Sequence, residues 1–350
     1  MKTAVAPRRR TARQAARPAP PRPSPTDDRL AQILAPLQED LDAVTDRLLE
    51  CLQNPVARMA TYLITAGGKR LRPALVLLAG RSGEYRKRRA ALIDLATAVE
   101  LIHTATLIHD DIIDESLLRR RQPTFHARFG TERAVLMGDY LYATAFSILA
   151  GLQEPALMGT MAEVCQQLSR GEFLEVDSRY NVELTEAQYL RIVEDKTASL
   201  IAACCRLGAQ VAGAKPETAE RIGQFGLRFG IAFQIMDDCL DLVGEEQAVG
   251  KPLLSDLEKG SLSLPMIYLA RSLTAPERDR LFAPLRAKRM TRGFLARVAA
   301  AARRSGAVTQ AMQAAESQIQ LATEAVAAGD GIMLPTTYLQ LARYTIERKR

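Results

Sequence analysis

The spacing of apolar residues is the feature that most restricts how this chain can fold. From about residue 28 onward, apolar residues recur at intervals of three and four, as at Leu30, Ile33, Leu34, Leu37 and Leu41. These intervals put apolar side chains on one face of a helix. No alternating apolar pattern is long enough to build a sheet, and no repeat of solenoid length is present. The chain is therefore expected to be all-α.

Helix-start and helix-break signals divide this pattern into separate helices. Capping boxes at Thr185 and Thr274 mark two helix starts, and clusters of glycine and proline mark the breaks. With 350 residues, of which 47% are hydrophobic and 25% charged, the chain can bury a large core. We expect one all-α domain over residues 29–350.

The first 28 residues have a different composition. Residues 1–26 contain seven of the 47 lysines and arginines, six prolines and no acidic residue, which leaves 40 cations and 40 anions elsewhere. Such a segment cannot bury enough apolar surface to fold, so residues 1–28 are predicted to form a disordered basic tail. Alternatives are a contact with anionic lipid, a contact with nucleic acid, or a transit peptide, which the prolines disfavour. The neutral remainder argues against a nucleic-acid-binding domain.

Cysteine usage and hydropathy bear on the compartment. The five cysteines are odd in number and lack C-x-x-C spacing, which favours a reducing cytoplasm. No apolar run approaches membrane-spanning length, so any membrane contact is expected to be peripheral.

One acidic pattern, Asp-Asp-x-x-Asp, occurs twice, at residues 110–114 and 237–241. In each copy the first and last aspartates are four residues apart, so on a helix they project from one face. Apolar helical runs precede both copies. A buried, unpaired carboxylate is costly, and oxygen-only clusters suit Mg²⁺, which bridges carboxylates to phosphates. A single copy would be read as a helix cap or a solvated face, but two copies that follow apolar runs predict metal sites.

Basic residues accompany the two acidic patterns. A glycine pair at 67–68 is followed by Lys69, Arg70 and Arg72, and three arginines at 119–121 follow the first acidic pattern. Cations after flexible glycines can surround an anion such as a diphosphate. Each cation alone would be a solvated surface charge, but together with two metal sites they indicate pockets for two diphosphates.

These motifs, in their order, resemble those of the trans-isoprenyl diphosphate synthases, or polyprenyl synthetases. The resemblance runs from Gly67 through Pro73, through the first acidic pattern and Gly171, and through the second pattern to Pro265. It implies an isoprenoid synthase-type bundle of helices around a central cavity. It also implies that the enzyme joins isopentenyl diphosphate to an allylic diphosphate with Mg²⁺, about three ions per active site.

The resemblance assigns roles to the matched residues. The expected metal ligands are Asp110, Asp111, Asp114, Asp237, Asp238 and, through water, Asp241. The expected contacts to the allylic diphosphate are Arg119, Lys196, Gln234 and Lys251. The expected contacts to isopentenyl diphosphate are Lys69, Arg70, His103 and Arg120, and Arg72 and Thr197 are expected to bind substrate. Electrostatic stabilisation of the departing pyrophosphate would supply the catalysis.

Three positions depart from the family pattern. Arg121 replaces the usual glycine, Leu117 replaces a common aspartate, and Ser261 stands after Gly260 where a lysine is usual. None removes a metal ligand, so we expect tuning rather than loss of activity. The missing lysine should weaken binding of the allylic diphosphate.

Product length should depend on residues one turn deeper than the first aspartates. These are Ala105 and Thr106, where short-chain relatives commonly carry aromatics. Small residues leave the tunnel open, and one helical turn of ~5.4 Å is about one isoprene unit. We therefore expect a product of about six to ten isoprene units, suited to a quinone side chain, with Tyr140, Tyr142 and Phe146 as candidates for the tunnel floor.

Alternative functions remain open from the sequence. A terpene cyclase would share the architecture but typically lacks the pocket for isopentenyl diphosphate, so residues 67–73 and Arg120 argue against it. A short-chain farnesyl or geranylgeranyl diphosphate synthase would keep the chemistry. The resemblance implies a homodimer, but a subunit that needs a different partner also fits, and product or tail could contact a membrane peripherally.

Overall fold

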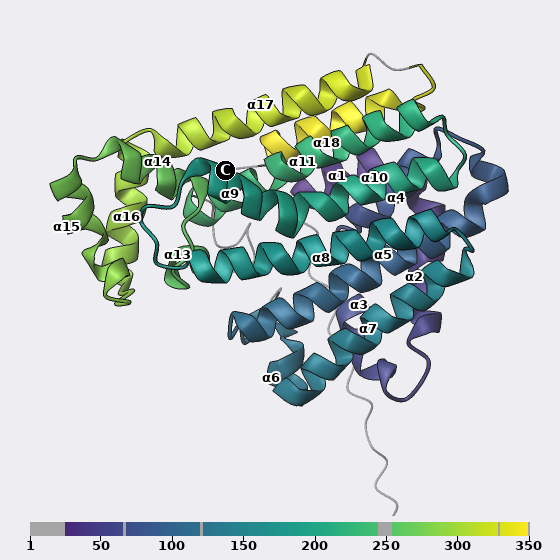
Figure 1. Ribbon diagram of the computed structural model, residues 1–350, viewed down its shortest axis with the longest axis horizontal. Helices are drawn as coiled ribbons and strands as arrows, with labels where there is room; N and C mark the ends of the chain where they lie inside the picture. The colour runs from purple at the N-terminus through teal and green to yellow at the C-terminus, as the bar shows by residue number, and fades with distance from the viewer. Residues whose placement is uncertain (1–24, 66–67, 120–121, 244–253, 328–329, 349–350) are drawn as a thin grey trace, which may run out of the picture.

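A computed structural model describes residues 25–65, 68–119, 122–243, 254–327 and 330–348 of the chain. They form a layered bundle of helices, with α17 along one edge and α7 near the opposite edge (Figure 1). The helical segments, in chain order, are α1 Pro25–Leu34, η1 Ala35–Leu37, α2 Gln38–Cys51, η2 Ala57–Ala60, α3 Thr61–Thr65, α4 Leu71–Gly80, α5 Tyr85–Ile113, α6 Phe125–Phe129, α7 Thr131–Gly151, α8 Pro155–Ser178, α9 Glu186–Val193, η3 Glu194–Ala198, α10 Ser199–Val211, α11 Pro216–Val243, α13 Ser255–Glu258, α14 Leu264–Ser272, α15 Ala275–Arg286, α16 Arg292–Arg304, α17 Ala307–Ala327 and α18 Pro335–Glu347.

The core is organised around two long helices, α5 and α11. Helix α5 packs against α2, α4, α7 and α10, and α11 packs against α10 and α17. Both helices are lined by fully buried side chains, such as Leu101 and Ile102 on α5 and Phe225 and Phe229 on α11. Because each helix is buried along much of its length, the residues at its C-terminal end are held by a packed scaffold.

The observed helix boundaries agree with the local sequence signals. Thr185 and Thr274 both form the predicted capping boxes, with Gln188 and Glu277 as their respective partners. Helix α1 begins at Pro25, so the boundary expected after residue 28 falls inside a helix. The fold is all-α, as predicted, apart from one hairpin in which β1 (Leu118–Arg119) pairs antiparallel with β2 (Gln122–Pro123).

The N-terminal end of helix α5 is anchored by Asp40. This buried aspartate of α2 accepts hydrogen bonds from Arg81 (2.9 Å), Arg89 (2.6 Å) and Tyr85. Tyr85 is the first residue of α5, so the cluster ties the start of α5 to α2. The helix is thereby anchored at one end and carries the acidic pattern at the other.

Two helices contain longer apolar stretches than the sequence analysis expected. Tyr85–Ile113 and Thr131–Gly151 are long and apolar enough to cross a membrane by length and composition alone. In the first, 67% of the most apolar window is buried inside the protein, and that helix is part of the core. The expectation that no apolar run approaches membrane-spanning length was therefore wrong as a statement about length, because buried core helices have the same composition.

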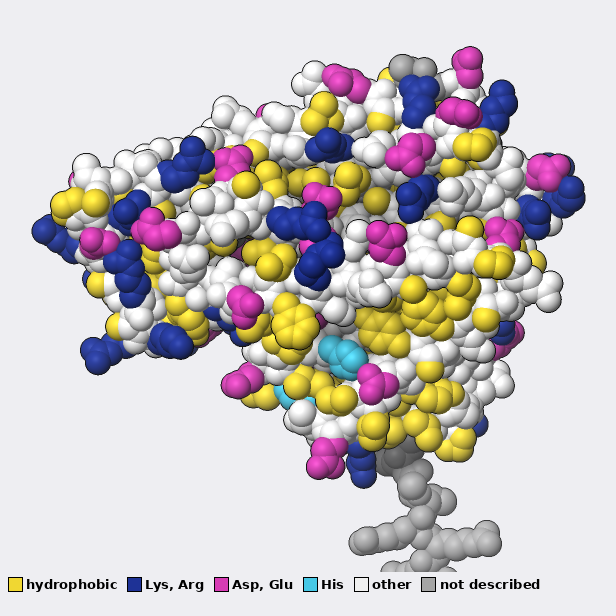
Figure 2. Space-filling model, in the orientation of Figure 1, with side chains coloured by type: hydrophobic (Ala, Val, Ile, Leu, Met, Phe, Trp, Pro, Cys, Tyr) yellow, Lys and Arg dark blue, Asp and Glu magenta, His cyan; other side chains and the backbone are white. Residues whose placement is uncertain are grey.

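An apolar surface lies over helices α7 and α8. Leu136 on α7 is 67% exposed and Phe173 on α8 is 72% exposed, with Val135, Leu174 and Val176 also exposed. Figure 2 shows apolar side chains gathered on this face of the molecule. An exposed patch of this kind marks an interaction surface in many proteins.

Candidate active site

The first aspartate pattern closes helix α5. Asp110 and Asp111 lie in its last turn, and Asp114 is its C-terminal cap, whose backbone N–H donates to the carbonyl oxygen of Asp110 at 2.8 Å. Helical geometry therefore places Asp110 and Asp114 one turn apart, as the spacing predicted. Ile108, just before them, is buried. The carboxylates thus stand at the rim of a packed apolar core.

Asp111 is paired with Arg119 of the hairpin. Nε of Arg119 lies 2.9 Å from Oδ1 and 3.1 Å from Oδ2 of Asp111, and Nη2 lies 2.8 Å from Oδ1. Burial raises the pKa of Asp111, while the hydrogen bond from Arg119 lowers it. The structure therefore brings Arg119 to the first aspartate pattern.

Asp110 is in a different environment. Burial raises the pKa of Asp110 to about 7, against the attraction of Lys196. Within the described parts of the chain, its carboxylate has no hydrogen-bond or ion-pair partner. A buried carboxylate without a partner favours binding of a cation.

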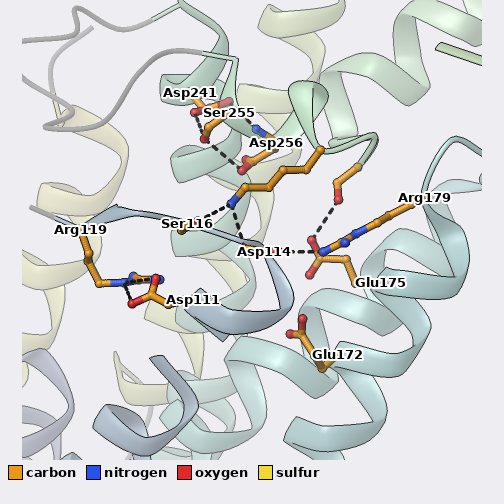
Figure 3. Close-up of polar contacts among 12 residues, drawn as sticks. Asp111, Asp114, Ser116, Arg119, Glu172, Glu175, Arg179, Asp241, Ser255 and Asp256 are labelled. Carbon is orange, nitrogen blue, oxygen red and sulfur yellow. Dashed lines mark hydrogen bonds and ion pairs between the residues drawn. The ribbon is translucent and has the colours of Figure 1, made fainter. Parts of the chain in front are cut away.

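Asp114 has two cationic partners from distant segments. Arg179, just after α8, donates from Nη2 to Oδ1 at 2.7 Å, and Lys259 donates from Nζ to Oδ2 at 2.8 Å (Figure 3). Burial acts to raise the pKa of Asp114, but the hydrogen bond and charge of Lys259, with Lys196 and Arg179, lower it overall. This aspartate is therefore stabilised in its charged form.

The second aspartate pattern lies near the C-terminal end of α11, and Asp238 is the middle one of its three aspartates. Buried Asp238 accepts hydrogen bonds from the hydroxyl of Tyr189 at 2.6 Å and from Nε2 of Gln234 at 2.8 Å. Gln234 in turn accepts a hydrogen bond from the hydroxyl of Thr197 at 3.0 Å. Burial raises the pKa of Asp238 well above its ordinary value, and the nearby charge of Asp256 adds to that shift.

The other two aspartates of this pattern bind segments from the C-terminal half. Asp237 accepts a hydrogen bond from Nη1 of buried Arg348 at 2.6 Å. Arg348 also lies over the ring of Phe233, with its guanidinium carbon 4.2 Å from the ring centre. Asp241 accepts a hydrogen bond from the hydroxyl of Ser255 at 3.0 Å. These aspartates, like Asp111 and Asp114, are held by protein donors.

Lys196 lies in η3, a π-helical segment between α9 and α10. Its Nζ lies 2.5 Å from Oε2 of both Glu172 and Glu175, two carboxylates one turn apart on α8. Burial disfavours its charge, but the two carboxylates and Asp110 raise the pKa of Lys196 above its ordinary value. Gly171 allows this arrangement, because a Cβ there would lie 2.5 Å from the backbone nitrogen of Lys196.

The cations that follow the glycine pair reach one side of α5. Nη1 of Arg72 lies 3.0 Å from Nε2 of His103, and Nε of Arg72 is buried without a hydrogen bond among the described residues. Burial lowers the pKa of Arg72, so an anion here would compensate for lost hydration. Arg70, in contrast, binds Glu100 at 2.5 Å and the carbonyl oxygen of Ile64 at 2.7 Å.

A small cavity of about 60 Å³ opens beside these cations. Its lining includes Arg70, His103, Asp111, Arg119 and Tyr62. It therefore connects the predicted isopentenyl diphosphate residues with the first aspartate pattern. Lys69 is exposed nearby in sequence, with Nζ 5.7 Å from the ring centre of Tyr344.

Some predicted residues lie outside the described segments. These are Arg120 and Lys251, together with Gly67 of the glycine pair and Arg121 of the departures. Other residues at the site were missed by sequence reasoning: Glu175, Arg179, Tyr189, Asp256, Lys259 and Arg348. Glu175 could have been found from its three-residue spacing from Glu172. The others come from segments far away in sequence and carry no local signal.

The predicted chain-length residues lie along α5 and α7. Ala105 is fully buried, and Thr106 is partly buried with its hydroxyl bonded to the carbonyl oxygen of His103 at 2.8 Å. The hydroxyl of Tyr140 accepts a hydrogen bond from Asn54 at 2.5 Å. Burial raises the pKa of Tyr142, with a further contribution from the charge of Asp110. The charge of the first aspartate pattern therefore acts on the hydroxyl of Tyr142.

The chemistry of the donors fits a hard divalent cation such as Mg²⁺. The candidates are carboxylates alone, and Asp110 has no hydrogen-bond or ion-pair partner among the described residues. Oε1 of Glu172 is buried without a hydrogen bond in the described structure, whereas Oε2 lies 2.5 Å from Nζ of Lys196. No group of three acidic, histidine or cysteine side chains among the described residues is already gathered around one point.

The arrangement defines the class of protein: an all-α isoprenoid synthase-type bundle with two carboxylate clusters and cationic pockets beside them. The polyprenyl synthetase family matches residues 53–300, and the chain belongs to this family. It is thus a prenyltransferase, and the substrates in its family are isoprenyl diphosphates.

Individual relatives agree with this assignment. Heptaprenyl diphosphate synthase component 2 of Geobacillus stearothermophilus is 42% identical over 235 residues, which cover 66% of this chain and 73% of that protein. A decaprenyl diphosphate synthase from Rhodobacter capsulatus superposes with a TM-score of 0.84 at 33% identity, over 93% of this chain and 99% of the other. A polyprenyl synthase from Caulobacter crescentus, complexed with calcium and isoprenyl diphosphate, gives 0.84 at 31% identity, over 94% of this chain and 100% of the other.

Proposed function

We propose that this protein extends an allylic diphosphate with isopentenyl diphosphate units to give a long-chain all-trans polyprenyl diphosphate. The observation that carries the proposal is the pair of aspartate patterns at the ends of α5 and α11, joined through Lys259 and Ser255. Such a pair can bind a metal–diphosphate unit from two sides. The relatives named for heptaprenyl and decaprenyl products support a long product.

The metal in this proposal is Mg²⁺, about three ions per site. Asp110, Asp111 and Asp114 would hold ions on one side and Asp237, Asp238 and Asp241 on the other. The calcium in the Caulobacter crescentus structure supports a divalent cation. Bound Mg²⁺ would neutralise the charge that develops on the departing pyrophosphate.

Protein cations supply the rest of the electrostatics. Arg119, Lys196 and Lys251 would bind the allylic diphosphate, and Thr197 and Gln234 would position it next to Asp238. Lys196 already lies next to Glu172 and Glu175, so its ammonium group is held in place before substrate arrives. Preorganised charge of this kind lowers the barrier to ionisation. The double bond of isopentenyl diphosphate then attacks the allylic cation, and loss of a proton completes the extension.

The second pocket would hold isopentenyl diphosphate. Lys69, Arg72, His103 and Arg120 are its proposed donors, and the pairing of Arg72 with His103 supports this group. Arg70 was predicted to bind the same diphosphate. Its contacts with Glu100 and Ile64 favour a supporting role, in which it shapes the start of α4.

Product length would be set along α5. The small side chains of Ala105 and Thr106 leave room for a growing chain, and Tyr140 and Tyr142 are the proposed floor. Purified protein should be incubated with Mg²⁺, isopentenyl diphosphate and farnesyl diphosphate, with products measured by mass spectrometry. Products of about thirty carbons or more support the proposal. Products that stop at about twenty carbons would refute the open tunnel, and no turnover would favour a partner-dependent subunit.

A second copy of the chain is the proposed partner for the α7 and α8 surface. Phe173, its most exposed member, directly follows Glu172, so this surface adjoins the site. Light scattering should give a dimer, and Phe173→Asp should give a monomer because it places a charge in the apolar contact. A wild-type monomer that dimerises only with another protein would instead favour a heteromer, as the name of the Geobacillus protein, component 2, suggests for that relative.

The cell compartment in this proposal is the cytoplasm. All five cysteines are free, and Cys204, Cys205 and Cys239 are buried. Free thiols are typical of a reducing compartment. Any contact with a membrane would then be peripheral, through the basic tail or the apolar product.

A further inference from the structure

Residues 254–261, which include α13, contact both aspartate patterns. At the start of this segment, the backbone N–H of Leu254 donates to the carbonyl oxygen of Asp241 at 2.9 Å, and the hydroxyl of Ser255 donates to Oδ1 of Asp241 at 3.0 Å. Figure 3 shows Ser255 and Asp256 next to Asp241. The segment is therefore fixed to the second pattern before it reaches the first.

At the other end, Lys259 meets the first pattern. Its Nζ donates to Oδ2 of Asp114 at 2.8 Å and to the hydroxyl of Ser116 at 3.2 Å. The side chain is 29% exposed and that of Asp114 is 19% exposed. Lys259 thus lies at the site itself, in contact with a proposed metal ligand.

Gly260 determines the direction in which Lys259 points. Its φ of +85° is a backbone conformation that favours glycine, and a Cβ there would lie 2.4 Å from the ring of Tyr180. The backbone N–H of Tyr180 also donates to the carbonyl oxygen of Gly260 at 2.7 Å. Beyond this turn, the hydroxyl of Ser261 lies 3.2 Å from Oε1 of Glu175. The turn therefore directs Lys259 to the first pattern and Ser261 to the carboxylates around Lys196.

Basic donors from two segments converge on Asp114. One carboxylate is paired with two cations, Lys259 and Arg179. Nε of Arg179 is also buried and has no hydrogen bond among the described residues. These two cations and the unused Nε donor of Arg179 lie where an allylic diphosphate is proposed to bind. They are complementary to an added anion.

We infer that Lys259 binds the allylic diphosphate and supplies from position 259 the cation that position 261 lacks. Its contact with Asp114 is then the substrate-free arrangement. When Asp114 serves as a metal ligand, the ammonium group of Lys259 is within reach of the phosphate oxygens that accompany the metal. The inference rests on the proposed function, because it assigns a residue to the same diphosphate site.

Direct binding tests this inference without turnover. The probe is a farnesyl thiodiphosphate that cannot ionise readily, titrated calorimetrically with Mg²⁺ into wild-type protein and Lys259→Met. Loss of a charge-assisted contact should raise the Kd about tenfold or more. Lys259→Arg keeps the charge and should stay within about threefold of wild type. The matched control is Lys87→Met, since Lys87 is 72% exposed and pairs only with nearby Glu84 among the described residues.

The outcomes separate the two levels of the argument. Equal Kd values for wild type and Lys259→Met would overturn the role of Lys259 and leave the proposed function intact. A wild-type protein that does not bind the probe at all would refute both. Lys259→Met should keep a cooperative urea unfolding transition, at somewhat lower stability because Asp114 loses a partner, and an unchanged Kd for isopentenyl diphosphate, which excludes general misfolding as the cause of weaker binding.

Discussion

Replacing Gly171 by alanine should separate α8 from the π-helical segment that carries Lys196. A Cβ at this position would lie 2.5 Å from the backbone nitrogen of Lys196 and 2.9 Å from its Cα, whereas ordinary contacts begin at 3.4 Å. The two segments must therefore move apart by about 0.9 Å, the difference between 2.5 and 3.4 Å. The obstructing atoms are backbone atoms, so no side-chain rotation can relieve the contact.

The magnitude follows from two opposing effects. Alanine is favoured over glycine inside a helix by about 0.5 to 1 kcal/mol. Overpacking a filled contact costs about 1 to 3 kcal/mol. Gly171→Ala should therefore lower the free energy of unfolding by up to about 2.5 kcal/mol. Because a displacement of about 1 Å can cost about a hundredfold in rate, kcat/KM for the allylic diphosphate should fall by about ten- to a hundredfold.

A glycine on the same helix provides the control. Gly159 is exposed, and nothing lies within 4 Å of where its Cβ would be. Gly159→Ala should raise the unfolding free energy by about 0.5 to 1 kcal/mol and leave kcat/KM unchanged. Urea unfolding and steady-state kinetics measure both variants. If Gly171→Ala matched Gly159→Ala in both assays, the close approach of α8 to Lys196 would not constrain the site.

Three further predictions concern the tunnel, the fold and the metal. Ala105→Phe places a large side chain one turn below the first pattern and should shorten the product seen by mass spectrometry; an unchanged length distribution would refute the proposed open tunnel. Asp40→Ala leaves the donors of Arg81, Arg89 and Tyr85 without their acceptor and should destabilise the protein by about 1 to 3 kcal/mol in urea unfolding. Exposed Asp42→Ala on the same helix should change it by less than about 0.5 kcal/mol. EDTA should stop product formation but leave the unfolding midpoint unchanged, because Asp111 and Asp114 are already neutralised by protein cations; a large drop in the midpoint would show that the metal is structural.

The fold was predictable from local patterns in the sequence. The apolar intervals predicted helices, and both capping boxes begin helices where expected, because a cap depends on residues only three positions apart. The aspartate patterns also fall at helix ends, as the apolar runs before them indicated. These features depend on neighbours in sequence, which one chain displays directly.

The contacts within the site were less predictable. Asp114 pairs with Lys259, 145 residues away, and Asp237 pairs with Arg348, 111 residues away. Such pairs depend on how helices pack, which the sequence alone does not specify. The π-helical turn at Lys196 was also missed, since no residue pattern marks it. The roles of the predicted site residues remain predictions, and Arg120 and Lys251 also lie outside the described segments.

Helix α5 is one continuous helix from Tyr85 to Ile113 and carries several proposed functional residues at different points along its length. His103 faces the small cavity, Ala105 lies in the buried interior, and Asp110 stands near the end. Because Asp40 anchors the N-terminal end of this helix, a substitution at one position along it need not shift the others. Selection could therefore change product length in small steps while the ionising chemistry stays intact. Related enzymes could differ in product length through substitutions along this one helix.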